Sequence, residues 1–198
     1  MTNLHTKEAT SMYHMFYGCS SLQNVTLTST FDVTASNDFR GMFQNCGKLE
    51  GVDLSKGFSV GAEGVTPATS SSMQNMFNGC TNLKRVRFYD ESQTGAASMF
   101  TGNNVTNVEG MFMDCMTLTE VDMHTFTMGN VTTMKDMFKG CYMLENVKFP
   151  ADSFNTIRVT DMSGMFEGCY KLATIDLSSF NNPGVNNQTN AELPITFT

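Results

Sequence analysis

The sequence lacks the features that would place it in several common classes of protein. None of its apolar runs is long enough to cross a membrane, and its first residues do not have the pattern of a signal peptide. Basic residues are scarce, because 12 Lys and Arg stand against 19 Asp and Glu, giving a net charge of −7. Without a basic stripe to neutralise phosphates, we expect no nucleic-acid partner. If the protein is exported, we expect its signal peptide or lipid anchor to be absent from this chain.

Sequence motifs of enzymes and of metal sites are absent as well. The chain has no Gly-x-Ser-x-Gly, no His-Glu-x-x-His and no phosphate-binding loop. It also has no Cys-x-x-Cys pair, and its three histidines fall out of register with its cysteines. His124 near Asp122 lacks a nucleophile that would make it part of a catalytic group. We therefore predict a protein that is not an enzyme and that has no cofactor and no metal.

What the sequence does contain is one pattern repeated six times, Met-x-x-Met-Phe-x-x-Cys-x-x-Leu-x-x-Val-x-Leu. The copies begin at Met12, Phe39, Met73, Val108, Met134 and Met162. One copy cannot fold alone, because ordering each residue costs about 1–2 kcal/mol and few apolar side chains are available to offset it. Stacked copies bury the faces that each would otherwise expose, so the pattern predicts a solenoid. We expect one repeat domain over 1–198, with six repeats at 11–180, a lead-in or cap at 1–10, and a cap or linker at 181–198.

Two spacings inside each copy predict two elements. Met, Met and Phe at i, i+3 and i+4 are spaced as one stripe of a short helix. The residue before each stripe is a preferred N-cap: Ser11, Asp38, Ser72, Asn107, Thr133 or Asp161. The residue seven positions after that cap is Gly, Asn or Asp, and of these Gly and Asn most readily take the left-handed conformation that ends a helix. The closing Leu-x-x-Val-x-Leu alternates with period two and predicts a short strand. The expected fold class is therefore α/β, a solenoid of about six rungs, each with one short strand and one short helix.

Cysteine and methionine mostly occupy fixed positions of the repeat. All six cysteines share one position, so we expect a column of reduced thiols in a tight buried turn. Disulfides between adjacent rungs stay open as an alternative, if the column brings the Cα atoms close enough. Most of the 17 methionines fall at the two inward positions of the predicted helix. We interpret them as core residues rather than as an adaptable binding surface.

The repeated pattern also resembles a known family. The Leu-x-x-Val-x-Leu closure, the Met-Phe-x-Gly-Cys segment and the Asn130-Val131-Thr132-Thr133-Met134 start resemble the bacterial surface-protein repeat of about 26 residues, related to the BspA-like leucine-rich repeat surface proteins. The resemblance implies a right-handed β-α solenoid on the cell surface, often in lipoproteins or wall-anchored proteins, some of which adhere to host proteins. It implies no catalytic residues. The chain departs from the family pattern in two longer connectors, 59–71 and 89–98.

Charged residues at the outward position of the predicted strands are the first candidate binding site. When the rungs stack, this position forms a column of alternating charge after its first member: Thr26, Asp53, Arg87, Asp122, Lys148 and Asp176. The neighbouring column offers a pair between Arg85 and Glu120. One interpretation is a solvated ladder of ion pairs, each worth about 0–1 kcal/mol. The other is a concave face that binds a protein or a glycan.

The two longer connectors are the second candidate, because long loops on adjacent rungs often carry recognition. Tyr89, Asp90 and Glu91 would supply an aromatic ring and two carboxylates there, although a tolerated insertion is the alternative. The sequence thus favours a non-enzymatic protein on the cell surface or outside the cell, a monomer that binds a host or extracellular protein or glycan. The alternative function is a structural spacer or stalk that presents another domain.

Overall fold

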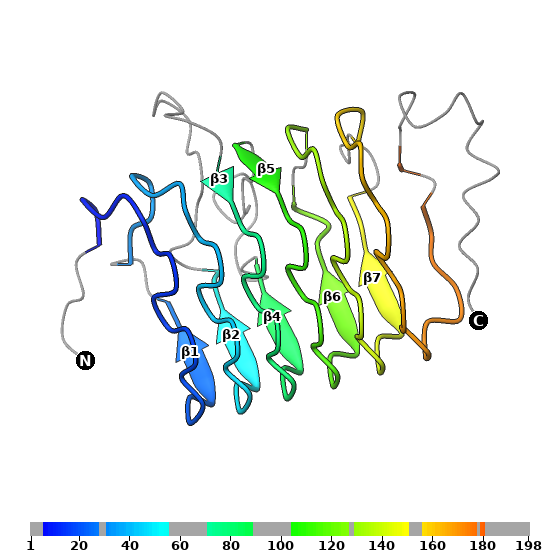
Figure 1. Cartoon of the computed structure of the whole chain (residues 1–198), viewed down its shortest axis with the longest axis horizontal. Coiled ribbons are helices and arrows are strands. Elements are labelled where there is room, and N and C mark those ends of the chain that lie inside the picture. Colours follow the sequence, from blue (N-terminus) through cyan, green and yellow to red (C-terminus); the bar gives the residue numbers. More distant parts are fainter. Residues whose placement is uncertain are drawn as a thin grey trace.

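The computed structural model describes residues 6–27, 31–55, 71–88, 104–126, 129–150, 156–177 and 179–180. Each copy of the repeated pattern forms one rung, and the rungs lie side by side in a single row (Figure 1). We number them in chain order: rung 1 is 6–27, rung 2 is 31–54, rung 3 is 71–88, rung 4 is 104–126, rung 5 is 129–150 and rung 6 is 156–177. The stacking predicted from the repeat is confirmed, because equivalent residues of successive rungs pair with one another.

Short parallel strands line one side of this row. They are β1 (Asn24–Thr26), β2 (Gly51–Asp53), β4 (Arg85–Arg87), β6 (Glu120–Asp122) and β7 (Asn146–Lys148). β1, β2 and β4 form one sheet and β6 and β7 another, with Val25 opposite Val52 and Val121 opposite Val147. The strand prediction is confirmed for these five rungs, whereas the corresponding residues of rung 6 form no strand within the described chain. A further pair, β3 (Ser71–Ser72) and β5 (Val105–Asn107), lies away from this row (Figure 1).

The prediction of a β-α solenoid with one short helix in each rung is wrong. No helix occurs in the described residues, and the Met-x-x-Met-Phe segment is a run of turns. The third residue of every copy has a positive φ, between 53° and 65°: His14, Gly41, Asn75, Gly110, Asp136 and Gly164. A right-handed helix needs negative φ throughout, so one left-handed residue in its middle ends it. The residue four positions further on also has positive φ in all six copies, as its sequence led us to expect.

Backbone hydrogen bonds in this segment alternate between two directions. In rung 1 the N–H groups of Met12, His14, Phe16 and Gly18 donate to carbonyls of rung 2 at 2.8–3.1 Å. The N–H groups of Met15, Tyr17 and Cys19 instead donate three residues back within the rung, at 3.0–3.1 Å. Rungs 2 to 5 repeat the alternation. A helix would keep all of these bonds inside the segment, whereas here every second bond joins the segment to the next rung.

The six residues predicted as helix N-caps accept hydrogen bonds, but these bonds close local turns instead of starting a helix. Each side-chain oxygen accepts the backbone N–H two residues later, at 2.8–3.3 Å: Ser11, Asp38, Ser72, Asn107, Thr133 and Asp161. This geometry is that of Asx and Ser/Thr turns, which compete with helix formation. These residues also form a parallel ladder from Ser11 through Asp38 to Ser72, and from Asn107 through Thr133 to Asp161. The prediction that these six side chains accept backbone hydrogen bonds is confirmed, but no helix begins at any of them.

The core is built from columns of identical side chains. The phenylalanine rings stack with centroids 5.1–5.5 Å apart and nearly parallel planes along the series Phe16, Phe43, Phe77, Phe112, Phe138 and Phe166. Every cysteine is a free thiol, and all but Cys19 are buried. Each buried thiol donates to the phenylalanine carbonyl of the preceding rung at 3.0–3.3 Å. The predicted column of reduced, buried cysteines is therefore confirmed from rung 2 onward.

Close contact between rungs explains why glycine occupies one of the positions with positive φ. Gly79 has a φ of +72°, and a Cβ there would lie 2.5 Å from Oδ1 of Asn45 in the preceding rung. The asparagine in one rung thus fills the space that a side chain of the next would need.

Candidate functional site

Six of the predicted binding residues, Asp53, Arg85, Arg87, Glu120, Asp122 and Lys148, lie on one surface, which we call the strand face. It consists of the outward side chains of the five strands: Asn24, Thr26, Asp53, Arg85, Arg87, Glu120, Asp122, Asn146 and Lys148. The pleat sends the central valine of each strand into the core and its two neighbours outward. Thr26 lies opposite Asp53, Asp53 opposite Arg87, and Asp122 opposite Lys148, as the column of alternating charge requires.

Around Lys148 the charges of the strand face are mutually satisfied. Its ammonium group lies 2.9 Å from Glu120 and 3.4 Å from Asp122. The hydrogen bond to Glu120 and the charge of Asp122 raise the pKa of Lys148. Burial would raise the pKa of Asp122, but hydrogen bonds from His124 and the charges of His124 and Lys148 outweigh it and lower that pKa. This cluster is a stable pairing of opposite charges, so its groups are largely satisfied by one another.

Around β4 the charges are less well matched. Arg87 lies 3.7 Å from Asp53, and its side chain is 53% exposed. Asp53 already accepts hydrogen bonds from the hydroxyl and the N–H of Ser55 at 2.6 and 3.0 Å. The ion pair of Arg87 is therefore long, and the carboxylate that it contacts is shared with Ser55.

Arg85 lies beside Arg87 on the same strand and is also exposed. The predicted pair of Arg85 with Glu120 does not form within the described chain, because Glu120 pairs with Lys148. Arg85 instead leans over β2, where a Cβ added to Gly51 would lie 3.3 Å from its Nε. The absence of a side chain at Gly51 thus lets the arginine lie against the sheet.

Two sets of predicted residues have a different outcome. Asp176 lies in rung 6, which forms no strand within the described chain, so it continues the column without the strand pairing of the others. Tyr89, Asp90 and Glu91, and most of the connectors 59–71 and 89–98, lie outside the described residues, and their role stays a prediction.

Exposed aromatic rings were not singled out in the sequence. Tyr142 and Tyr170 stack at 5.4 Å and are 40% and 73% exposed. In rung 1, Tyr13 is 52% exposed and lies beneath the guanidinium of Arg40 at 5.2 Å. The stacking of the first pair could have been predicted from the sequence, because Tyr142 and Tyr170 hold the same repeat position in adjacent copies.

The described chain offers no group of three or more His, Cys, Asp or Glu side chains placed to hold a metal ion. Nor does that part of the chain contain a helix that could span a membrane. The buried thiols are held in the neutral form, because burial raises the pKa of Cys46 to about 11 and those of Cys80 and Cys169 to about 12.

Comparison with known proteins gives a family and two structural similarities. A leucine-rich repeat protein from Bacteroides ovatus is 20% identical, with a TM-score of 0.44 over 84% of this chain and 40% of that one. A leucine-rich repeat protein from Eubacterium ventriosum is 15% identical, with a TM-score of 0.44 over 88% of this chain and 45% of that one. The chain thus spans less than half the length of either protein. No curated protein matches it. The family described as "Mycoplasma protein of unknown function, DUF285" matches residues 1–104 and 71–192, and the chain belongs to that family.

Proposed function

We propose that this repeat protein is a non-enzymatic binding module of the cell surface or extracellular space, and that it recognises a host or extracellular protein or glycan through its strand face. The resemblance of its repeat to those of BspA-like surface proteins supports the location and the adhesive role.

The pair of exposed arginines on β4 is the observation that carries the proposal. Arg85 has no ion pair within the described chain, and Arg87 has one at 3.7 Å. Lys148, by contrast, has two carboxylates within 3.4 Å. A ligand that approaches β4 therefore meets one guanidinium group without an ion pair in the described chain and one whose ion pair is long, so little existing pairing must be broken.

The chemistry of arginine narrows the ligand. Guanidinium groups bind carboxylates in a planar, two-point geometry that lysine cannot offer. We therefore propose that the ligand presents carboxylates, as an acidic protein segment or an acidic glycan does. The proposal is compatible with the overall charge of −7, because recognition depends on the local pair rather than on the net charge.

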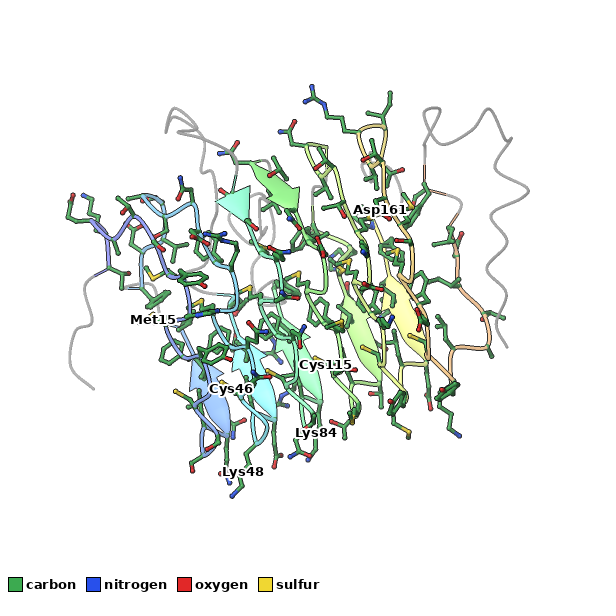
Figure 2. The ribbon with its side chains drawn as sticks, viewed as in Figure 1. Met15, Cys46, Lys48, Lys84, Cys115 and Asp161 are labelled. Atoms are coloured by element: carbon green, nitrogen blue, oxygen red, sulfur yellow. The ribbon has the colours of Figure 1, made fainter. Side chains whose placement is uncertain are left out.

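The test is a binding screen of the full chain against extracellular-matrix proteins and acidic glycans. We expect saturable binding to at least one of them, and a loss of about tenfold or more when Arg85→Glu and Arg87→Glu are combined. The matched control is Lys48→Glu with Lys171→Glu, which makes the same change in net charge at two exposed lysines on turns within rungs 2 and 6. Figure 2 labels Lys48 at the lower edge of the row of rungs. Equal losses in both double variants would mean that net charge, and not the strand face, governs binding.

A spacer or stalk is the second candidate function, and one observation favours it. Backbone hydrogen bonds join each rung to the next from rung 1 to rung 6, and such a ladder makes a stiff body suited to presenting another domain. The same screen separates the two functions. A chain with no saturable ligand, whose arginine variants behave as the wild type, would be a spacer.

A further inference from the structure

The second strand of the row, β2, carries a glycine at an outward position where its backbone does not require one. Gly51 pairs with Asn24 of β1 and with Arg85 of β4 in regular parallel register, without a bulge. Its φ is not positive, so its backbone conformation is open to residues with a side chain. Glycine inside a strand weakens a sheet, and where no bulge or bend explains it, it often marks the close approach of another group. What lies above Gly51 therefore explains the glycine.

Two side chains close over Gly51 from the neighbouring strands. A Cβ added to Gly51 would lie 3.2 Å from Oδ1 of Asn24 and 3.3 Å from Nε of Arg85. Gly51 is accordingly buried, although the residues on both sides of it are exposed. The glycine thus brings the amide of Asn24 and the guanidinium group of Arg85 to the two sides of one position on the strand face.

The charges of rungs 2 and 3 match at two positions and fail to match at this one. Lys84 lies 2.9 Å from Glu50, and Arg87 lies 3.7 Å from Asp53. Arg85 lies between these two basic residues in the sequence, and its partner on β2 is the glycine. Rung 3 therefore presents one more basic side chain than rung 2 presents carboxylates, and the basic side chain left over is that of Arg85.

The strand on the other side of β4 does not supply the missing carboxylate. Glu120 holds the equivalent position on β6, but β4 and β6 belong to different sheets, and Glu120 lies 2.9 Å from Lys148. The side chain of Arg85 leans the other way, toward β2. Its guanidinium group makes no ion pair or hydrogen bond within the described chain, and the same holds for the amide of Asn24. Both groups are therefore available to a ligand.

We propose that this position is a subsite for one carboxylate of the ligand, which takes the place of the acidic side chain that β2 lacks. The inference rests on the proposed function, because it identifies where the strand face holds its ligand. The carboxylate accepts hydrogen bonds from the guanidinium group of Arg85 and from the amide N–H of Asn24, since an amide offers a donor as well as an acceptor. Gly51 is a positioning residue, because it leaves the space for the carboxylate and lets Arg85 lie beside that space.

The direct test is titration of the full chain with hexaglutamate, followed by the NMR signals of the arginine Nε–H groups. We expect a saturable shift of the Arg85 signal that is larger than that of the Arg87 signal. Arg85→Gln should weaken hexaglutamate binding about tenfold, whereas Arg87→Gln, the matched control on the same strand, should weaken it about twofold or less. Equal losses in the two variants would contradict the subsite, because any positive charge on β4 would then serve.

A parallel titration with hexagalacturonate identifies the source of the carboxylate. This probe carries its carboxylates on sugar rings, whereas hexaglutamate carries them on a peptide. The probe that binds more tightly shows whether the subsite favours an acidic glycan or an acidic protein segment. If neither probe shifts the Arg85 signal, the subsite does not exist.

Gly51→Asp supplies the missing carboxylate from within the chain. The new side chain would lie opposite Arg85 and pair with it, so the Arg85 signal should shift without a ligand, and hexaglutamate binding should weaken about tenfold. Asn146→Asp is the matched control, because it adds the same charge at the equivalent position of β7, where the partner on β6 is Glu120. This control should bind hexaglutamate as the wild type does. A thermal melt of each variant establishes that it is folded, and equal effects of the two substitutions would overturn the proposal.

Failure of the subsite and failure of the proposed function give different results. The screen of extracellular ligands could find a partner whose binding needs the two arginines but is unchanged by Gly51→Asp. The strand face would then bind its ligand without the subsite. Conversely, hexaglutamate binding at Arg85 together with a screen that finds no partner would support the subsite and refute the proposed function.

Discussion

The column of buried thiols should make the protein sensitive to alkali. Burial raises the pKa of Cys46 to about 11, raises those of Cys80 and Cys169 to about 12, and raises those of Cys115 and Cys141 well above the ordinary value of 9.0. In the unfolded chain these thiols ionise near 9.0, so the unfolded state gains stability as the pH rises past that value. In the folded state they stay neutral until about pH 11–12. The stability they contribute is therefore fully present below pH 9 and is lost as the pH rises toward the folded-state values.

The size of this loss of stability follows from the number of buried thiols. Each one lowers the free energy of unfolding by about 1.4 kcal/mol for each pH unit between the two pKa values. Five of them acting together amount to about 7 kcal/mol per pH unit. Since a domain is stable by about 5–15 kcal/mol in total, we expect unfolding between about pH 9.5 and 11.

The assay is urea unfolding followed by circular dichroism under reducing conditions, at a series of pH values from 7 to about 10.5. The control is a double variant, Cys80→Ser with Cys115→Ser, which keeps a donor for the carbonyls of Phe43 and Phe77 but removes two of the five ionisable thiols. Its free energy of unfolding should fall with pH about three-fifths as steeply as that of the wild type. The reasoning is refuted if the two proteins have the same slope, or if the wild type keeps its stability from pH 9 to 10.

Three other changes test the packing of the rungs. Gly79→Ala should lower the free energy of unfolding by about 2–4 kcal/mol, because this position combines a φ of +72° with close contact to Asn45. Gly18→Ala is the control, because Gly18 has a φ of +67° but open space around it, and this variant should lower the free energy of unfolding by only about 1–2 kcal/mol. Equal losses would mean that the contact between rungs does not matter. Asn107→Ala removes the acceptor that holds the N–H of Glu109 at 2.8 Å, and urea unfolding should show a loss of about 0.5–2 kcal/mol, against none for exposed Asn24→Ala. Mild peroxide should lower the melting temperature once the buried methionines form sulfoxides, and a melt that does not move would place them outside the core.

The candidate site was partly predictable from the sequence. The pattern placed Asp53, Arg87, Asp122 and Lys148 on one outward column, because strand residues two apart share a face and equivalent residues of a repeat stack. It did not predict that Glu120 pairs with Lys148 rather than with Arg85. That choice depends on which long side chain leans toward which strand, and Gly51, by lacking a side chain, lets Arg85 lie over β2.

The sequence by itself determined that equivalent residues would stack, because only neighbouring copies can bury the apolar positions that one copy exposes. It also determined the columns of phenylalanine, methionine and cysteine that form the core. What only the tertiary structure decided was the form of the Met-x-x-Met-Phe segment. The spacing of its apolar residues is compatible with a helix. However, His14 and the equivalent residue of every rung are left-handed, and alternate N–H groups donate to the next rung instead. Those bonds exist only when a neighbouring rung supplies the carbonyls, so no local pattern within one copy could reveal them.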